Sequence, residues 1–343
     1  MFVDTTCSSS SSQWLHSPAS DHQPLKSRYT IYHELGSGLH GRVLLAYDHL
    51  VHRDVAIKVP AGFPPVSPRS GITKCPPDQE LQHQVSSLIH EFHAMACIQH
   101  PNVLQVDHLV TRSSNYVALV TEFAPNGDLF DLLETSGALP EPLGKVYTCQ
   151  LLRALAACHA NGVVHRDVKP ENLLLDATYQ LKLADFGVGA TAPLGMQVHD
   201  LMLRDESGTA LYMAPEVKSS QGFYRGPPVD VWSAGIVLFI LLTGLPPFDR
   251  AERGDVSYDA LLARDFASFW KSQPDQVLWT VSAGARHLIT SMLRAPNERI
   301  TVTEALQHSW LRGGADQVDS DWIHQAVLTH LEAARTAKNA SPS

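Results

Sequence analysis

The stretch "ELGSGLHGRVLLAYD", residues Glu34–Asp48, decides how the rest of this chain is interpreted. It contains three glycines in the spacing G-x-G-x-x-G, at Gly36, Gly38 and Gly41. Two unrelated folds use this spacing. In a dinucleotide-binding βαβ unit the glycines turn a strand into a helix, whose N-terminus holds the pyrophosphate. In the other fold they form the tip of a β-hairpin, where missing side chains let backbone amides approach phosphates.

The residues after the last glycine favour the hairpin. The stretch "RVLLAYDHLVHRDVAIKV", 42–59, consists of two apolar runs of strand length separated by a turn. A dinucleotide fingerprint needs a helix directly after Gly41 and an acidic residue that closes a strand about twenty residues later. Asp54 and Lys58 do not fit that pattern. Residues 30–59 therefore predict three short antiparallel strands, with the glycines at a hairpin tip.

The rest of the chain changes from β-rich to helical. Residues 60–78 are rich in Pro and Ser, lack hydrophobic periodicity and predict a loop insertion. Apolar spacing predicts a helix over 81–99 and strands around 103–111 and 116–123. After residue 126 the pattern is mainly helical, and the helices expected there cover 142–161, 229–243, 284–294 and 302–309. This order predicts an α+β fold.

The two ends of the chain differ from the middle. Residues 1–28 are Ser-rich and are predicted to be disordered. The tail, 312–343, is short, and its segment "VDSDWIHQAVLTHLEAARTAK" predicts one amphipathic helix. The longest apolar run, "VWSAGIVLFILLTG" at 231–244, is interrupted by small polar residues and is too short to span a bilayer. It predicts a buried core helix, so a membrane is not expected as a partner.

Composition limits the class of protein. Of the 343 residues, 44% are hydrophobic and 18% are charged, as in folded globular proteins. The net charge of −9 and the lack of a basic run argue against nucleic acid as a partner. The five cysteines are scattered and include no C-x-x-C pair, and the N-terminus lacks the features of a signal peptide. These features predict reduced thiols in a cytoplasmic or nuclear protein.

Four more motifs follow the glycine-rich stretch in a fixed order: "VAIK" (55–58), "HRDVKPEN" (165–172), "DFG" (185–187) and "GTALYMAPE" (208–216). With "GSGLHGRV" at 36–43, they make the chain resemble the eukaryotic protein kinase family over about residues 29–311. The eight-residue motif is the most specific. Its Lys169, two residues after Asp167, is typical of Ser/Thr kinases.

The resemblance implies a two-lobed fold and one reaction. A small β-rich lobe is expected over 29–123 and a larger helical lobe over 126–311. The implied activity is transfer of the ATP γ-phosphate to Ser or Thr hydroxyls of proteins, with Mg²⁺ as the metal. A catalytically silent, kinase-like scaffold is the alternative. It would need the loss of Lys58, Asp167 or Asp185, and all three are present.

The resemblance also implies roles for single residues. Asp167 matches the catalytic base and Lys169 the lysine near the γ-phosphate, while Asn172 and Asp185 match the magnesium ligands. Lys58 matches the lysine that binds the α- and β-phosphates. Its expected partner is Glu91, which lies at the family spacing of nine residues before the histidine of "HPNV". Further ATP contacts are implied for Leu35, Gly36, Ser37, Gly38, Leu39, His40, Gly41, Val43, Ala56, Thr121, Glu122, Ala124 and Leu174.

Within this set, Thr121 matches the gatekeeper, and Glu122–Ala124 match the hinge whose backbone binds adenine. Three residues match structural positions. Glu216 and Arg299 are expected to form a buried ion pair, and Asp230 is expected to hold the catalytic loop.

One position departs from the family pattern. Arg166 matches the arginine that usually pairs with an activating phosphate on the activation segment. That phosphate lies four residues before Thr209, which matches the threonine that hydrogen-bonds the catalytic Asp and Lys. In this chain Asp205 occupies the phosphate position. A carboxylate carries less charge than a phosphate, but it can order the loop in the same way. Asp205, helped by Glu206, is therefore a candidate built-in activator. The alternative is a solvated acidic loop controlled through Ser207 or Thr191.

Substrate preference and subgroup rest on fewer residues. Asp128 and Glu171 match acidic positions that face basic residues of the substrate in basophilic kinases. "LFILLTGLPPFD" and "RITVTEALQHSWL" look most like the calcium/calmodulin-dependent kinases and their SNF1-like and checkpoint-like relatives. The tail lacks the basic face of a calmodulin target, so calmodulin binding is not predicted.

Overall fold

The computed structural model describes residues 28–38, 41–61, 78–113, 116–218, 222–249, 252–312 and 318–340. Leu39 and His40, and nearly all of the expected disordered tail and loop insertion, lie outside these residues. The chain divides into two compact units. The first comprises residues Met1–Ala96, Gln105–Phe123 and Ala192–Met196, and the second comprises the remainder.

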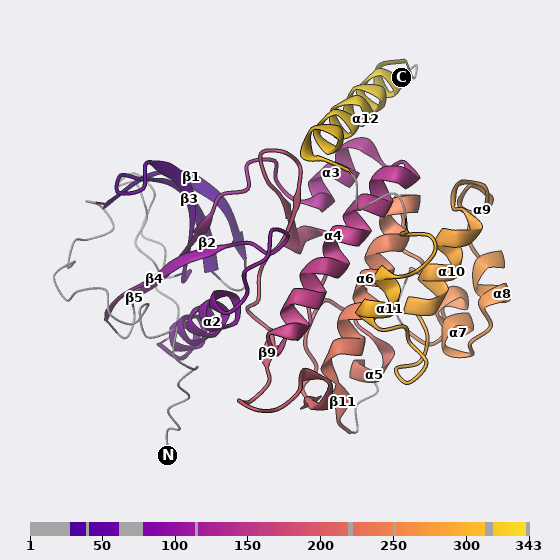
Figure 1. Cartoon of the computed structure of the whole chain (residues 1–343), viewed down its shortest axis with the longest axis horizontal. Helices are drawn as coiled ribbons and strands as arrows, with labels where there is room; N and C mark the ends of the chain where they lie inside the picture. The colour runs from indigo at the N-terminus through magenta and orange to yellow at the C-terminus, as the bar shows by residue number, and fades with distance from the viewer. Residues whose placement is uncertain are drawn as a thin grey trace. The chain divides into compact units, whose positions relative to one another are not determined.

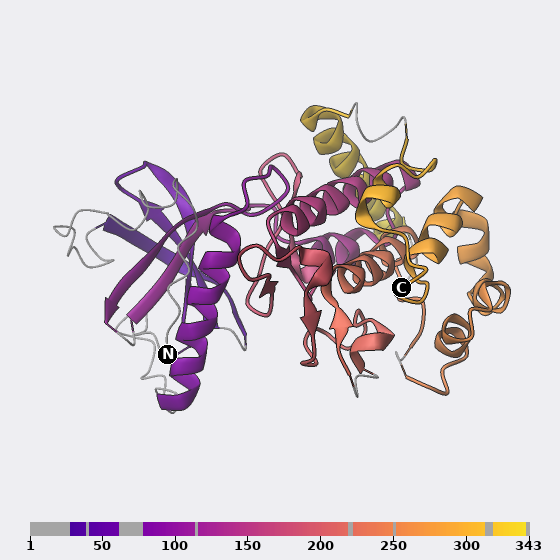
Figure 2. The same ribbon diagram turned by 60° about the horizontal axis from the view of Figure 1, so that its bottom comes forward.

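The first unit contains an antiparallel sheet of five strands in the order β1-β2-β3-β5-β4. Helix α2 packs against β4 and β5 (Figures 1 and 2). The chain continues as a strand directly after Gly41, so the glycines lie at a hairpin and the dinucleotide-binding alternative is wrong. The elements are β1 (Tyr29–Gly38), β2 (Gly41–Asp48), β3 (Arg53–Val59), α2 (Asp78–Ala96), β4 (Val106–Ser113) and β5 (Tyr116–Glu122).

The two faces of this sheet have different side chains because successive residues of a strand alternate in direction. One face carries a buried apolar cluster, which consists of Tyr29, Leu44, Ala46, Val55, Ile57, Val59, Ala118 and Val120. The strand register puts Val43 opposite Lys58, and Ala56 opposite Thr121, on the other face. Strand alternation therefore places Val43, Ala56, Lys58 and Thr121 on a single surface. Glu122 is paired with Val55 and falls on the opposite face.

The second unit is mainly helical and surrounds α6 (Gly226–Thr243), which packs against α4 and α10. Among the described residues, α6 is the one helix long and apolar enough to cross a membrane, with 18 residues and a mean hydropathy of 1.5. It is longer than the apolar run at 231–244 suggests, but 89% of it is buried inside the fold. It is therefore a core helix, as the sequence predicts.

The other helices of this unit, visible in Figure 1, are α3 (Leu129–Ser136), α4 (Glu141–Ala160), α5 (Pro215–Lys218), α7 (Val256–Leu262), α8 (Phe266–Lys271), α9 (Asp275–Thr280), α10 (Ala283–Met292), α11 (Val302–Leu306) and α12 (Ser320–Ala340). Three short antiparallel pairs accompany them: β6 (Val163–Val164) with β9 (Ala190–Thr191), β7 (Leu173–Leu175) with β8 (Leu181–Leu183), and β10 (Met202–Leu203) with β11 (Tyr224–Arg225). The predicted α+β class is confirmed.

Several predicted boundaries are wrong. The helix expected over 302–309 ends at Leu306, and the helix expected over 284–294 ends at Met292. The helix expected over 81–99 ends at Ala96, ahead of Pro101. The strand expected from Val103 begins at Val106, because Val103 instead forms a parallel bridge with Leu183. Where the sequence predicts one amphipathic tail helix, α12 packs against α3 and α4 through buried residues that include Ile323 and Val327.

Alanine substitutions at two glycines of the hairpin are expected to affect stability differently. A Cβ on Gly41 would lie 2.2 Å from the Val59 carbonyl oxygen, at a φ of +120°. A Cβ on Gly36 would meet nothing within 4 Å. Gly41→Ala should therefore lower the free energy of unfolding by about 1–3 kcal/mol, whereas Gly36→Ala should change it little. Calorimetric unfolding of the two variants checks this, and equal melting temperatures would contradict the hairpin geometry.

Candidate active site

In the first unit, Lys58 meets Glu91 in the way that their sequence positions predict. The Lys58 Nζ lies 2.8 Å from Glu91 Oε2, and the two side chains are 14% and 4% exposed. Glu91 follows Leu88 by three residues and precedes Met95 by four, so all three lie on the buried face of α2. A carboxylate in this position needs a partner, which Lys58 supplies. The loop insertion has therefore not displaced the helix register.

Other predicted ATP contacts among the described residues of this unit lie on β1 and β5. Gly36, Ser37 and Gly38 form the end of β1, whose bulge leaves Leu35 43% exposed. The hydroxyl of Thr121 is part of a nearly buried side chain and donates to the Glu122 carbonyl oxygen at 3.1 Å. The Glu122 carboxylate accepts from the Gln105 backbone amide at 2.8 Å. The contact with adenine expected of a hinge therefore falls to the backbone of Glu122, not to its side chain. Ala124 and Leu174 belong to the second unit.

In the second unit, the carboxylate of Asp230 holds the catalytic loop. It is fully buried, and its two oxygens accept from the backbone amides of His165 at 3.0 Å and Arg166 at 2.8 Å. The ring of His159 lies 2.8 Å from the same carboxylate. Burial raises the pKa of Asp230, but the hydrogen bond to His159 and the charges nearby outweigh it, so the pKa lies below its usual value. The group is thus an ionised anchor.

His159 is a partner that the motifs do not indicate. It lies at the end of α4, six residues before the loop that it helps to fix, and only the tertiary structure brings it to Asp230. The loop needs such support because Arg166 has a φ of +68°, an unfavourable conformation for a residue with a Cβ. Two hydrogen bonds from backbone amides to one buried carboxylate offset that strain.

The side chain of Asp167 lies at the centre of a polar cluster. Its Oδ1 accepts from the backbone amide and the hydroxyl of Thr209, both at 2.8 Å. Its Oδ2 lies 2.8 Å from Lys169 Nζ and 3.1 Å from Asn172 Nδ2. Burial raises the pKa of Asp167, but the hydrogen bonds from Lys169 and Thr209 outweigh it and hold the pKa below its usual value. An ionised carboxylate so placed can accept a proton from a hydroxyl.

Thr209 reaches this cluster because a glycine precedes it. Gly208 has a φ of +104°, and a Cβ there would lie 2.5 Å from the Arg166 carbonyl oxygen. Only glycine permits this approach of the activation segment to the catalytic loop. The "GT" pair of the motif therefore acts as a unit: the glycine allows contact and the threonine also accepts from Lys169 Nζ at 2.8 Å.

The predicted metal ligands lie at one end of the β7–β8 hairpin. Asn172 directly precedes β7, and Asp185 follows β8 by two residues, with Leu173 paired to Leu183. The Asn172 amide nitrogen donates to the Asp167 carbonyl oxygen at 2.8 Å, which leaves the amide oxygen for a cation. One carboxylate and one amide oxygen are hard donors that suit Mg²⁺ when phosphates and water complete the shell. The residues present therefore fit this metal.

The carboxylate partner of Arg166 is Asp205. The guanidinium Nη1 lies 2.8 and 2.7 Å from the two carboxylate oxygens, and the Arg166 Nε donates to the Val188 carbonyl oxygen at 2.6 Å. Asp205 also accepts from the Ser207 hydroxyl at 2.9 Å. Burial raises the pKa of Asp205, but the bonds to Arg166 and Ser207 outweigh it and lower the pKa. The other regulatory candidates, Glu206 and Thr191, are exposed.

The predicted structural pair is also present. Arg299 Nη1 lies 2.6 Å from Glu216 Oε1, and the arginine side chain is 1% exposed. Asp128 has a role that the kinase motifs do not indicate: it caps α3 by accepting from the Asp131 amide at 2.9 Å. An aspartate directly before a helical pattern is the signal for such a cap. Burial raises the pKa of Asp128, and the nearby charges of Asp131 and Glu171 add to this.

Loss of charge at Asp230 should destabilise the second unit. Asp230→Asn replaces an acceptor with a donor that faces buried N–H groups, and we expect a loss of about 3–5 kcal/mol of unfolding free energy. Urea denaturation measures it, with Asp321→Asn on the exposed surface of α12 as the matched control. A midpoint equal to that of the control would show that this carboxylate does not hold the loop.

Comparison with known proteins agrees with this geometry. The family described as "Protein kinase domain" matches residues 29–311. The chain is 36% identical over 286 residues to CBL-interacting protein kinase 9 of Oryza sativa subsp. japonica, covering 83% of this chain and 57% of that protein. It is 35% identical over 309 residues to CBL-interacting serine/threonine-protein kinase 26 of Arabidopsis thaliana, covering 89% and 64%.

The chain thus spans about three fifths of the length of these curated relatives. The Arabidopsis relative is named as a serine/threonine-protein kinase, which agrees with the Ser/Thr type expected from the sequence. The matches also agree with the expected group of calcium/calmodulin-dependent kinases and their SNF1-like and checkpoint-like relatives. On the family match, the identity and the motifs now placed in the fold, this chain belongs to the protein kinase family.

Proposed function

We propose that this chain is an active Ser/Thr protein kinase that transfers the γ-phosphate of ATP to Ser or Thr hydroxyls of proteins. The observation that carries the proposal is the cluster around Asp167, in which an ionised carboxylate is held by Lys169 and Thr209. In the reaction, a bond forms between the hydroxyl oxygen and the γ-phosphorus, and the bond from that phosphorus to ADP breaks. Asp167 takes the hydroxyl proton, and Lys169 offsets charge near the transferred group.

We further propose Mg²⁺ as the metal, held by Asn172 and Asp185. When bound, it supplies positive charge that neutralises the phosphates as the transfer proceeds. In the other unit, Glu91 holds the Lys58 ammonium in a fixed orientation for the α- and β-phosphates. The silent-scaffold alternative has no observation in its favour, since every charged residue that it would need to lose is present.

Activity is tested with phosphatase-treated chain, Mg²⁺, labelled ATP and Ser/Thr peptides. We expect transfer to at least one peptide and a fall of about a hundredfold in Asp185→Asn, since one charged ligand is lost. If no transfer is detected, a separate measurement of ATP binding by calorimetry shows whether the nucleotide site is intact. The absence of both transfer and ATP binding would favour the scaffold. A transfer rate that is unchanged in the Asp185→Asn variant would refute the assignment of Asp185.

The same peptides test substrate class. We propose a preference for basic residues near the target hydroxyl, which Glu171 supports because it is exposed and electrostatically coupled to Asp128. Glu171→Gln is the better variant, because Asp128 also caps α3. The variant should lose the preference for Arg-containing over neutral peptides while it keeps its rate on the neutral ones. The thiols of Cys149 and Cys158, which form no disulfide within the described part of the chain, support our proposal that the protein works in the cytoplasm or nucleus.

Asp205 is proposed to replace an activating phosphate. It supplies two carboxylate oxygens to the arginine that follows the catalytic-loop histidine, and its backbone oxygen accepts from the Tyr224 hydroxyl at 2.7 Å. The activation segment is thereby attached to the catalytic loop at a point one residue from Asp167. The chain is then active without an upstream kinase acting at this position.

Asp205→Asn should lower the rate of the phosphatase-treated chain about fivefold, which corresponds to about 1 kcal/mol for a partly exposed ion pair. Because the pKa of Asp205 lies below 3.8 in the fold, its contribution is present above that pH and is lost only as the pH falls through the lowered pKa. The ratio of the two rates should therefore be constant between about pH 6 and 8, whereas a phosphate, with a second pKa of about 6, would change its charge. A ratio of one would contradict the proposal.

A further inference from the structure

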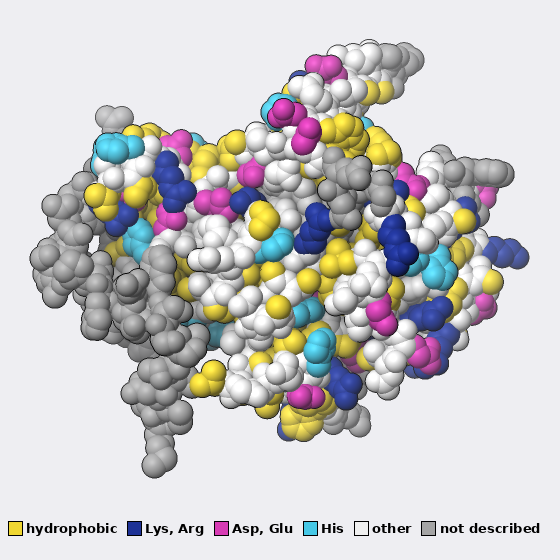
Figure 3. Space-filling view, viewed as in Figure 1, with side chains coloured by type: hydrophobic (Ala, Val, Ile, Leu, Met, Phe, Trp, Pro, Cys, Tyr) yellow, Lys and Arg dark blue, Asp and Glu magenta, His cyan; other side chains and the backbone are white. Residues whose placement is uncertain are grey.

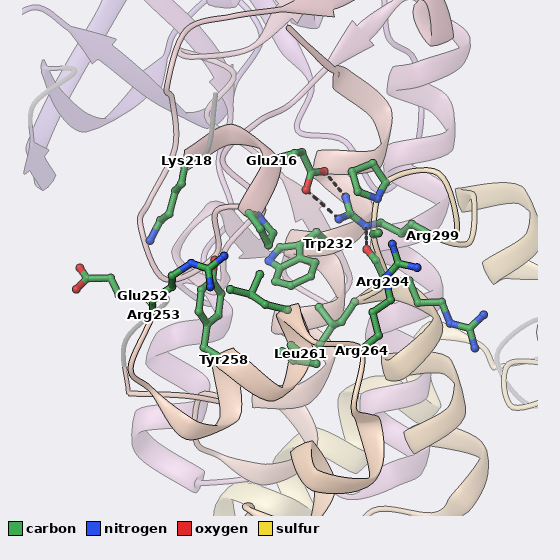
Figure 4. Close-up of a pocket in the computed structure, with 15 residues that line it drawn as sticks. Glu216, Lys218, Trp232, Glu252, Arg253, Tyr258, Leu261, Arg264, Arg294 and Arg299 are labelled. Carbon is green, nitrogen blue, oxygen red and sulfur yellow. Dashed lines mark hydrogen bonds and ion pairs between the residues drawn. The ribbon is translucent and has the colours of Figure 1, made fainter. Parts of the chain in front are cut away.

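The helical unit has a cavity apart from the catalytic cluster. Its volume is about 540 Å³, and it is lined by residues of α5, α6, α7 and the segment 293–299 (Figure 4). Its walls are largely apolar and include Trp232, Tyr258, Leu261 and Leu293. Figure 4 shows the indole of Trp232 between the Glu216–Arg299 ion pair and the side chain of Tyr258. A cavity of this size holds one or two side chains of a ligand.

The charges around this cavity are unlike those of the whole chain. Five of its fifteen lining residues are Lys or Arg and two are Glu, although the chain has a net charge of −9. On the face seen in Figure 3, by contrast, side chains of both signs are interspersed. In Figure 4, Lys218 and Arg253 lie on one side of the cavity, and Arg264 and Arg294 lie on the other. Arg264 is paired with Glu298 at 2.6 Å, so the positive rim consists mainly of Lys218, Arg253 and Arg294. An apolar cavity with a positive rim favours a ligand that carries negative charge.

Two of the lining residues also have buried donors without an acceptor among the described residues. They are the indole Nε1 of Trp232, a side chain that is 2% exposed, and the Nε of Arg294. Both atoms are donors only. Buried polar groups in proteins are nearly always hydrogen-bonded, so each of these two donors needs an acceptor, which water or a ligand can supply.

We propose that this cavity is a docking site for an acidic peptide segment of a partner protein, with an apolar side chain as its anchor. The anchor fills the space between Trp232, Tyr258 and Leu261. Flanking carboxylates meet Arg253 and Arg294, and carboxylate or backbone oxygens accept from the two buried donors. A free anion would leave the apolar walls in contact with water, and a basic peptide would meet like charge. The proposal concerns binding alone and does not depend on the kinase activity.

The test uses the full chain and a fluorescein-labelled ten-residue peptide with a central Leu-Phe pair flanked by Glu and Asp. Fluorescence anisotropy should show saturable binding. Two control peptides isolate the chemistry: one has Gln and Asn in place of the acids, and the other has Ser-Ser in place of Leu-Phe. Each control should bind at least tenfold more weakly. Equal binding of the Ser-Ser peptide would show a simple anion site and overturn the proposal.

Arg253→Glu tests the location, because Arg253 lines the cavity and is exposed, so that its replacement leaves the core intact. The matched control is Arg335→Glu, which makes the same charge change at an exposed position of α12 outside the cavity lining. We expect the first variant to bind the acidic peptide at least fivefold more weakly and the second to bind it like the unmodified chain. No saturable binding to the unmodified chain, or equal weakening by the two variants, would refute the docking site.

Discussion

The helical unit depends on one buried carboxylate. Asp230 stands in the first turns of the most buried helix of the fold and accepts two backbone amides of the catalytic loop. A buried charge is costly unless every oxygen has a donor, and His159 supplies the third. The interaction fixes Arg166 at a positive φ, and that conformation determines where Asp167 and Lys169 point. The polar cluster is thus built outward from the hydrophobic core.

Arg166 connects this anchor to the activation segment. Its amide is held by Asp230, and its guanidinium is held by Asp205 and by the Val188 carbonyl oxygen. Two residues from different parts of the chain therefore restrain one arginine from opposite ends. The Asp205 carboxylate is more exposed than the Arg166 side chain, at 59% against 9%, so it is the member of the pair that contacts solvent.

The Glu216–Arg299 pair has two consequences in the same unit. It closes the end of the activation segment onto the segment before α11, and Arg299 also lies over the Trp232 ring, 5.1 Å from its centroid. The ion-paired residues Glu216 and Arg299 thus also line one wall of the proposed docking cavity. A ligand there would contact the base of the activation segment without contact to Asp167.

Local sequence determined the parts of this protein that depend on spacing. The glycine hairpin, the sheet alternation, the helical face that carries Glu91 and the order of the motifs all follow from short-range patterns. Only the tertiary structure decided what distant segments share. The contact of His159 with Asp230 depends on how α4 and α6 pack, and the contact of Gly208 with Arg166 depends on how two distant loops meet, so no local periodicity encodes either. The Asp128 cap of α3, by contrast, is a local contact. The cavity beside Trp232 is the clearest case, since its charges come from four separate segments and their sum exists only in the folded chain.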